Sequence, residues 1–554
     1  MRTKTLWLLL ATFVAGLTLV AAGCGGDDDE GDEAAGTAAT QEEGGNLAAE
    51  QVITINWGAE PPSLDPGLAS DTTSAAILLN IMDPLVLLDR DNNPQPSMAE
   101  SWEISEDGKT VTFTLNPDGM WTNGDPVTAE DYEYSWKRTI SPELAADYAY
   151  QFYGIVGAQE YNGCESNCAA LADEVGVNAV DDQTLEVTLT SAQPWFIQQV
   201  AHTSFLAVHR PTVEQFGDKW TEAANIVTNG PFQLESWQHN SRIDLVKWDE
   251  WRDADSISLT RVNGRMITDA TTSVQAYEAG EIDINPNLPV EEIERIKETE
   301  DYEKYPALGT YYYGFNIENI SDVNQRRAMS LAIDRREIID NITQEDQLPA
   351  TGFTPEGMPG FESINPESPW LPETADMEQA QELMSQVANP KRDITLLLND
   401  APGHREIAVA VQAAWKELGL NVTIRTQEWA QFLEFIGPPP DESIDVFRLG
   451  WIGDYVDAIN FLELWKSDSG NNSTNFKNEE FDQLVEEARA TPDNEGRYEL
   501  YAQLEEILLG EDGEVPITPI YFYTASYQER ASVKETFYES LLGQVDLRGV
   551  EVRE

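Results

Sequence analysis

The chain has 554 residues, with 99 Asp and Glu against 34 Lys and Arg, which gives a formal net charge of −65. This charge argues against nucleic acid as a partner and against docking onto an anionic membrane through a basic surface, because both need clustered cations. Disorder is not expected either, since 41% of the residues are hydrophobic and 15 Trp, 19 Tyr and 18 Phe can build a core. The length predicts two or three domains.

The N-terminus has the layout of an exported lipoprotein. Two cations precede an apolar run over residues 6–20, and residues 21–24 read AAGC, which resembles a lipobox. We therefore expect a signal peptide over residues 1–23 and lipidation at Cys24. An ordinary signal peptide or an uncleaved anchor is the alternative, because Ala21 stands where Leu is commonest and the apolar run is marginal for a membrane span.

Residues 24–50 read as a tether between the anchor and the folded body. After the cysteine they are rich in Gly, Ala, Asp and Glu, with nine acidic residues and no basic one. Such a segment cannot bury apolar surface, so we expect it to be disordered. In an exported protein, the remaining pair Cys164 and Cys168 is expected to form a local disulfide.

From residue 51 onward, strand and helix patterns alternate without strict βαβ regularity, which predicts a mixed α/β or α+β protein. Alternating apolar and polar residues between turn signals predict strands at 52–57, 109–115, 184–189 and 242–246. An N-cap and an acidic first turn predict that a helix starts at Thr128. Helical periodicity predicts further helices over 322–339, 376–387, 404–418 and 478–509.

The sequence contains no recognisable catalytic or metal-binding motif. No nucleophile elbow, phosphate-binding loop or dinucleotide fingerprint occurs. The four histidines lack a metal-binding spacing; these histidines are His202, His209, His239 and His404. We therefore expect no catalytic activity, no cofactor and no metal. A carboxylate pair of the glycosidase kind would escape notice among so many acidic residues, so a secreted hydrolase stays open.

Six groups of motifs are spread over nearly the whole chain after residue 50. They are EPPSLDP at 60–66; MAESWEI at 98–104, continuing through 107–115 and 121–136; FGDKW at 216–220, continuing to 232; TYYY at 310–313 with 326–335; 415–429; and RLGWIGDY at 448–455. Together they resemble the solute-binding proteins of peptide-type ABC importers, the oligopeptide- and dipeptide-binding family, and most closely its oligopeptide-binding branch.

This resemblance implies a two-lobed fold of the type II periplasmic-binding-protein kind, in which a hinge closes the lobes on the ligand. Lobe I would comprise residues 51–82, 208–309 and 522–554, and lobe II residues 310–521. A small extra domain would cover residues 83–207. Some relatives carry a disulfide at the positions of Gly309 and Ile452, so that bridge is absent here.

The resemblance also implies where a peptide would bind. Asp454 matches the residue that pairs with the ligand α-amino group, the alternative being that it is merely one of the 99 acidic residues and lies on a turn. Arg448 and His404 match positions that hold the ligand carboxylate, the alternatives being an internal salt bridge and a surface helix residue. A further Arg of the family has no counterpart within residues 436–440.

Other matches concern the ligand backbone and side chains. Gly450, Trp451 and the segment 70–72, including Thr72, match segments that pair with the main chain of an extended peptide. Trp429 and Tyr150 match positions in pockets for ligand side chains, although Trp429 could equally pack in the core.

We therefore expect a monomeric, lipid-anchored receptor outside the cytoplasm that delivers oligopeptides to a separate ABC permease and ATPase. A non-peptide ligand such as an oligosaccharide, an opine or a metal complex is the first alternative, because fold is more constant than ligand. A secreted hydrolase that acts on peptides or glycans is the second, and a signalling or folding-assistance role that uses the same groove is the third.

Most of the negative charge belongs to the folded body. Residues 51–554 carry 90 acidic and 32 basic residues, and only 12 of all 34 cations are Lys. This composition suggests adaptation to high salt, where a Debye length of ~3 Å at 1 M relieves self-repulsion. An acidic habitat is the alternative.

Overall fold

A computed structural model describes residues 46–90, 92–364, 369–400, 403–491, 493–534 and 536–554. The expected signal peptide, Cys24 and most of the expected tether lie outside the described residues. Within the described part of the chain, no helix is both long enough and apolar enough to cross a bilayer.

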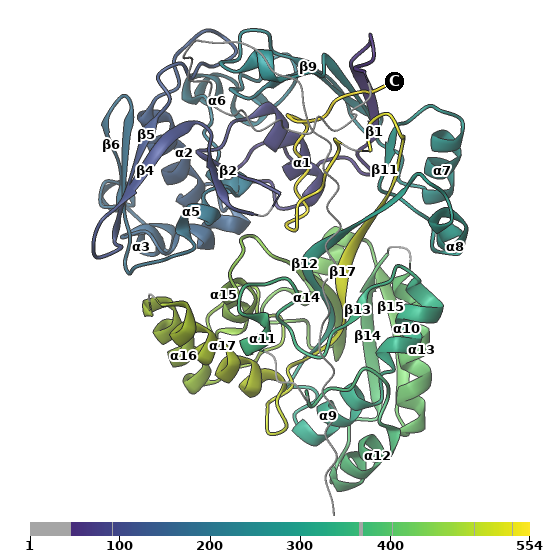
Figure 1. Cartoon of the computed structure of the whole chain (residues 1–554). Helices are drawn as coiled ribbons and strands as arrows, with labels where there is room; N and C mark the ends of the chain where they lie inside the picture. Colours follow the sequence, from purple (N-terminus) through teal and green to yellow (C-terminus); the bar gives the residue numbers. More distant parts are fainter. Residues whose placement is uncertain (1–45, 91, 365–368, 401–402, 492, 535) are drawn as a thin grey trace, which may run out of the picture. The chain divides into compact units, whose positions relative to one another are not determined.

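The largest sheet mixes parallel and antiparallel strands, which confirms the mixed α/β class (Figure 1). Its strand order is β15-β14-β16-β12-β17-β11-β1-β10-β9-β8, and β13 pairs with β17 outside this path. These strands are β1 (Val52–Asn56), β8 (Phe232–Gln238), β9 (Arg242–Lys247), β10 (Arg261–Arg265), β11 (Ile284–Asn285), β12 (Tyr302–Phe315), β13 (Leu348–Pro349), β14 (Asp393–Asn399), β15 (Asn421–Gln427), β16 (Val446–Ile452) and β17 (Ile517–Glu529).

Two smaller sheets lie within residues 83–207. One pairs β2 (Val86–Leu88) with β3 (Pro94–Pro96), and the other has the order β4-β5-β7-β6. The strands of the second sheet are β4 (Ala99–Ile104), β5 (Thr110–Leu115), β6 (Val177–Asp181) and β7 (Thr184–Thr188). The inward residues of β5 and β7, such as Phe113 and Leu185, pack with α2 (Ala129–Ile140) in a separate core.

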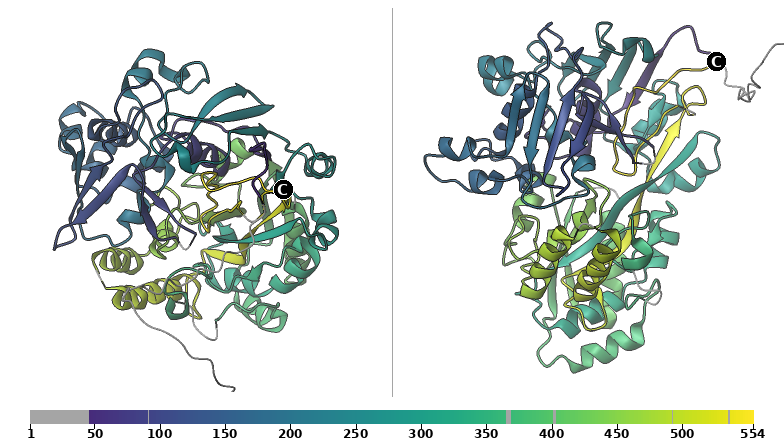
Figure 2. Two further views of the ribbon diagram at one scale, coloured as in Figure 1. Left: turned by 45° about the horizontal axis from the view of Figure 1, so that its top comes forward. Right: turned by 60° about the vertical axis from the view of Figure 1, so that its left-hand side comes forward.

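The remaining α-helices surround the sheets in all three ribbon views (Figure 1 and Figure 2). They are α1 (Thr72–Ile81), α3 (Ala158–Asn162), α4 (Ala169–Ala172), α5 (Phe196–Gln199), α6 (Arg210–Phe216), α7 (Ala270–Glu278), α8 (Ile293–Lys297), α9 (Val323–Leu331), α10 (Arg335–Ile338), α11 (Phe361–Ile364), α12 (Met377–Gln386), α13 (His404–Glu417), α14 (Trp429–Ile436), α15 (Ile459–Leu462), α16 (Glu479–Ala490) and α17 (Asn494–Leu509).

The predicted strands and the predicted helix start are confirmed. β1, β5, β7 and β9 match the four predicted strands to within one or two residues at each end. At α2, the Thr128 backbone N–H donates to the Asp131 carboxylate at 2.8 Å, as part of a capping box. The predictions of helices at 376–387 and 404–418 are also confirmed, by α12 and α13.

Two predicted helices were each too long. The stretch 322–339 contains a break before Asp334, whose side chain accepts from the Glu337 N–H and caps α10. The stretch 478–509 is divided into α16 and α17, and the Asp493 side chain accepts from the Gly496 N–H at the start of α17. In both cases the helical spacing of apolar residues continues past the break, but an Asp side chain caps a new helix there and ends the preceding one.

β12 and β17 are the longest strands, and they run side by side through the middle of the large sheet (Figure 1). One end of the pair, at Tyr302–Pro306, adjoins the half of the sheet that contains β1 and β8–β11. The other end pairs with β16. The register shifts between Pro306 and Thr310. The expected lobe boundaries at 309/310 and 521/522 fall inside these two strands, and the division into lobes stays a prediction.

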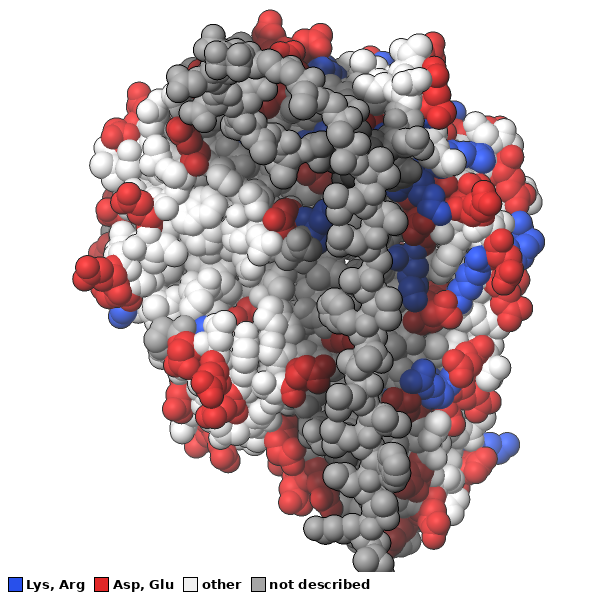
Figure 3. Space-filling view, viewed as in Figure 1, with Lys and Arg blue, Asp and Glu red and all other residues white. Residues whose placement is uncertain are grey.

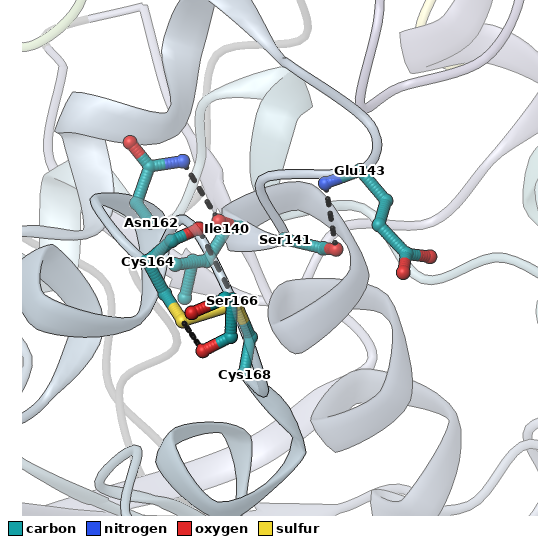
Figure 4. The surroundings of a disulfide bond; sticks show 7 residues. All are labelled: Ile140, Ser141, Glu143, Asn162, Cys164, Ser166 and Cys168. Atoms are coloured by element: carbon teal, nitrogen blue, oxygen red, sulfur yellow. Dashed lines mark hydrogen bonds between the residues drawn. A yellow bond between two sulfur atoms is a disulfide. The ribbon is translucent and has the colours of Figure 1, made fainter.

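A disulfide joins Cys164 to Cys168 in the loop between α3 and α4 (Figure 4). The neighbouring Asn162 side chain donates to the Ile140 carbonyl at 2.8 Å, which ties this loop to the end of α2.

Acidic side chains spread over the visible face of the molecule, whereas the Lys and Arg side chains gather in its right-hand half (Figure 3). The negative charge is therefore a property of the folded body as well as of the N-terminal segment.

Candidate ligand-binding site

The candidate site is built around β16 and the loop that follows it. β16 pairs with β12 along its whole length, from Val446 opposite Phe315 to Ile452 opposite Gly309. On the other side, β14 pairs only with Val446 and Phe447. Among the described strand pairs, one edge of β16 is therefore open from Arg448 to the end of the strand, where its main-chain groups can pair with an added strand.

Asp454 lies two residues beyond β16 and is buried, with 6% of its surface exposed. Its Oδ2 accepts hydrogen bonds from the Tyr150 hydroxyl at 3.1 Å and from the Asn460 side-chain amide at 3.0 Å. Its own backbone N–H donates to the Asn460 Oδ1 at 2.9 Å. Asp454 is therefore held in one place by uncharged groups and is not on an exposed turn.

His202 faces the same carboxylate from the small expected domain. Its Nδ1 accepts from the Ser204 backbone N–H at 3.2 Å, so the proton of the neutral ring sits on Nε2, which lies 3.9 Å from the Asp454 Oδ1. Burial lowers the pKa of His202 to about 4. The ring is therefore neutral at pH 7 and does not neutralise Asp454.

Burial also raises the pKa of the Asp454 carboxyl, to about 6, against the opposing effect of hydrogen bonds from Asn460, Tyr150 and Tyr148. Among the described residues, no Lys or Arg forms an ion pair with Asp454. A buried carboxylate in neutral surroundings is costly, and a ligand cation would relieve that cost.

Arg448 is the opposite case, a buried cation with 8% of its surface exposed. Its Nη2 donates to the Tyr523 hydroxyl at 2.7 Å and its Nη1 to the Asn399 Oδ1 at 3.3 Å, and its guanidinium carbon lies 4.5 Å from the centre of the Tyr311 ring. In the described part of the chain, Arg448 has no carboxylate partner, so the alternative of an internal salt bridge finds no support. The site can accept an anionic group.

His404 and Gly450 complete the surroundings of Arg448. The His404 Nδ1 lies 3.4 Å from the Tyr311 hydroxyl at the start of α13. Burial and the nearby Arg448 charge lower the pKa of His404 to about 3, so the ring is neutral. Gly450 is required for space, because a side chain at this position would collide with the Tyr523 hydroxyl that Arg448 contacts.

The structure joins most of the residues expected from the sequence into two clusters. The Trp451 indole N–H donates to the Asn460 Oδ1 at 3.1 Å and so belongs to the cluster around Asp454. Thr72 is exposed on the first turn of α1, and none of the described contacts joins it to either cluster. The Trp429 side chain lies outside the described residues.

Sequence reasoning missed several residues of the two clusters. They are Tyr148, His202 and Asn460 near Asp454, and Tyr311, Asn399 and Tyr523 near Arg448. Tyr311 lies in the TYYY motif, but the motif does not say which ring would face Arg448. A polar cavity of about 400 Å³ adjoins the second cluster, because Asn399 lines it together with Arg405 and Gln427.

The described side chains offer no evident metal site. Among them, no group of three or more His, Cys, Asp or Glu is arranged to hold a metal ion. The chemistry of the site is therefore that of two buried, opposite charges beside an open strand edge.

Residues 93–473 match the family model described as bacterial extracellular solute-binding proteins, family 5 middle. The chain is 35% identical to the oligopeptide-binding protein OppA of Bacillus subtilis, over 87% of this chain and 89% of that protein. It is also 33% identical to the probable deoxycholate-binding periplasmic protein YgiS of Escherichia coli, over 86% of this chain and 89% of that protein.

Two solved structures show the same fold with different degrees of similarity. Haemophilus influenzae OppA in complex with the peptide RPPGFSPFR matches with a TM-score of 0.82, at 30% identity, over 92% of this chain and 100% of that chain. The murein tripeptide binding protein MppA in its unliganded open form matches with a TM-score of 0.70, at 29% identity, over 92% of this chain and 99% of that chain. The described arrangement is therefore more similar to the peptide complex than to the open form.

Proposed function

Because the chain belongs to the bacterial extracellular solute-binding proteins of family 5, we propose that it captures oligopeptides outside the cytoplasm and delivers them to an ABC permease. The observation that carries the proposal is the pair of buried charges on one stretch of chain. Asp454 and Arg448 are both buried, both have uncharged partners, and the open edge of β16 lies between them.

Asp454 would receive the α-amino group of the peptide. An ammonium group satisfies a buried carboxylate through charge-assisted hydrogen bonds, which are stronger than neutral ones. The Tyr150 hydroxyl already occupies one lone pair of Oδ2, and the His202 Nε2 faces Oδ1. These contacts fix the direction in which the carboxylate can accept from a ligand.

Arg448 would receive the α-carboxylate, with neutral His404 as a neighbouring group. Guanidinium groups bind carboxylates through two parallel hydrogen bonds, and Arg448 stacks on the Tyr311 ring, which holds its plane in one orientation. The Tyr523 and Asn399 side chains occupy only some of its five donors.

The positions of the two charges set a direction and a span for the ligand. With its amino end at Asp454 and its carboxyl end at Arg448, an extended peptide would run antiparallel to β16 along the open edge. Six residues of extended chain span at most ~20 Å, so a peptide needs no more than about six residues to reach from one charge to the other. Main-chain pairing of this kind does not depend on the ligand side chains and gives broad specificity.

A non-peptide solute is the second candidate, and the similarity to YgiS, named for deoxycholate, favours it. A solute like deoxycholate carries a carboxylate but no ammonium group. It would engage Arg448 and leave Asp454 unpaired, so the two candidates differ in whether Asp454 matters.

We further propose that the mature protein is a monomeric lipoprotein anchored through Cys24, on the strength of the AAGC sequence and the acidic segment after it. Mass spectrometry of the mature N-terminus tests this directly. A diacylglycerol-modified Cys24 is the expected result, and a mature chain that begins elsewhere would contradict it.

Native mass spectrometry of protein purified from its host tests the proposed function. We expect co-purified ligands with masses of short peptides. A single non-peptide mass would favour the second candidate. We also expect the purified protein to return a mixture of peptides intact after incubation, since we propose a receptor and not a hydrolase.

A further inference from the structure

Trp195 packs into a different core from its immediate neighbours. Phe196, Ile197 and Val200 are buried in the core of residues 85–207. Trp195, only 5% exposed, is instead buried among residues between 308 and 542. A change of core between two adjacent residues means that Trp195 joins residues 83–207 to another part of the fold.

The contacts of Trp195 lie on the loop that carries Asp454. Its ring stacks on Tyr455 with a centroid separation of 6.4 Å and an interplanar angle of 10°. The Arg497 guanidinium lies 5.7 Å from the Trp195 ring and forms an ion pair with Asp457 at 3.1 Å. Trp195 therefore contacts Tyr455, the residue after Asp454. Through Arg497 it is also linked to Asp457 on the same loop.

Residues 83–207 thus hold this loop at two points. The Tyr150 hydroxyl contacts the Asp454 carboxylate, and Trp195 contacts the next side chain along the chain. Both contacts are made by aromatic side chains with little freedom of rotation, which suits them to fixing a position.

The sequence around Trp195 is consistent with a docking segment. Residues 187–209 contain no Asp, Glu, Lys or Arg, although 24% of the chain is charged and 23 residues would on average hold five or six such side chains. In a chain this acidic, an uncharged stretch marks a surface that is covered in the folded protein.

We propose that Trp195 is a positioning residue for the amine-binding site: it holds the Asp454 loop against Tyr150 and does not touch the ligand. The inference rests on the proposed function for the chemistry of the ligand. The docking of Trp195 on the loop does not depend on that function, and the two can be tested separately.

The first test compares Trp195→Ala with the unmodified protein by calorimetry, using a tetrapeptide and its N-acetylated form. We expect Kd for the free peptide to rise at least tenfold, which corresponds to about 1.4 kcal/mol. We expect Kd for the acetylated peptide to change less than threefold, because that peptide does not use Asp454. The conservative variant Trp195→Phe keeps a stacked ring and should restore Kd to within threefold.

The double variant Trp195→Ala/Asp454→Asn separates positioning from general destabilisation. If Trp195 acts through Asp454, the double variant binds the free peptide within threefold of Asp454→Asn alone. If instead the factors by which the two single substitutions raise Kd multiply in the double variant, the proposal is wrong.

The second test needs no ligand. Hydrogen exchange should be faster in residues 453–460 of Trp195→Ala, because the Asp454 N–H to Asn460 hydrogen bond depends on the position of the loop. Exchange in residues 232–247 of β8 and β9 should stay unchanged and serves as the folding control. If exchange in the control segment also changes, Trp195→Leu replaces Trp195→Ala as the test variant, because Leu keeps apolar volume but has no ring. The expected results are the same.

The two tests distinguish the proposals. A protein that binds no peptide refutes the proposed function, while the exchange experiment still decides the role of Trp195. If Trp195→Ala folds and both its Kd and the hydrogen exchange of residues 453–460 are unchanged, Trp195 does not position the loop, whatever the ligand.

Discussion

The substitution Asp454→Asn removes the charge of the proposed amine anchor with little change of shape. Asn keeps an oxygen that can accept from Tyr150 and Asn460, which now contact the carboxylate at 3.1 and 3.0 Å. The variant should therefore fold with the same loop position. What it loses is the negative charge that a ligand ammonium would meet.

The size of the effect follows from burial. Asp454 is 6% exposed and has no cationic partner among the described residues, so the ammonium would be its single counter-charge. Removing one member of a buried, hydrogen-bonded charge pair costs about 2–5 kcal/mol, much of it from the charge left unpaired. We expect Kd for a tetrapeptide to rise at least tenfold, by ~30-fold at the lower end of that range and by several hundred-fold near its middle.

Calorimetry with the tetrapeptide and its N-acetylated form measures the effect. Acetylation removes the positive charge of the ligand α-amino group. Asp454→Asn should therefore bind the acetylated peptide as well as the unmodified protein does, or better. Asp468→Asn is a matched control, since it changes the net charge equally at a side chain that is 70% exposed. Unchanged Kd for the free peptide in Asp454→Asn would refute the amine-anchor role.

The same substitution should stabilise the empty protein at neutral pH. The pKa of Asp454 is raised from 3.8 to about 6, so the ionised carboxylate destabilises the folded state by about 3 kcal/mol. Because the folded state binds the proton more tightly, this destabilisation develops as pH rises from about 4 to about 6 and is absent below pH 4. Asp454→Asn should therefore unfold at higher temperature than the unmodified protein at pH 7 but not at pH 3.5.

Four further predictions test other parts of the account. Affinity for a free peptide should be highest between about pH 6 and 8, since Asp454 must be ionised and the ligand amine, with a pKa of about 8, must be charged; titration calorimetry that shows no fall by pH 5 would contradict this. Arg448→Met should weaken binding of a peptide with a free carboxylate by ~2–5 kcal/mol and spare its C-terminal amide, and Arg448→Lys should not restore it, because Lys cannot form the paired hydrogen bonds. Replacing Cys164 and Cys168 by Ser should lower the free energy of unfolding by roughly 2 kcal/mol, as expected for a short loop, and leave Kd unchanged in the same titration. Molar NaCl at neutral pH should raise the melting temperature, and a protein that gains nothing from salt would contradict the high-salt interpretation of its charge.

The sequence predicted local structure well where pattern and turn signals agree. The alternating residues of β5 and β7 lie between turns, and the Thr128 cap precedes an acidic first turn, so each boundary has a local cause. The overlong helices at 322–339 and 478–509 show the limit. There the apolar period continues across Asp334 and Asp493, and only the structure shows that each of these residues starts a new helix.

The site was predictable in its charges but not in its surroundings. Asp454 and Arg448 are expected as binding residues because RLGWIGDY resembles a motif of the peptide-binding family. The neutrality of the partners of Arg448 depends on residues such as Asn399 and Tyr523, which reach it from two other strands. His202 belongs to a segment more than 240 residues away in sequence from Asp454. Such long-range pairs follow from topology, which periodicity and spacing cannot supply.

The uncharged stretch 187–209 is the one sequence signal that could have indicated Trp195 and His202. Its lack of charge stands out only against the acidity of the rest of the chain, and it names no partner. The structure supplies the partners, Tyr455 and Asp454, on the loop after β16.

We propose that the protein recognises both charged ends of a peptide. One set of titrations tests it most directly: the unmodified protein at pH 7 with a tetrapeptide, its N-acetylated form and its C-terminal amide. We expect each modification alone to weaken binding at least tenfold, since each leaves Asp454 or Arg448 buried without its counter-charge. Equal affinity for the free and the N-acetylated peptide would contradict the account.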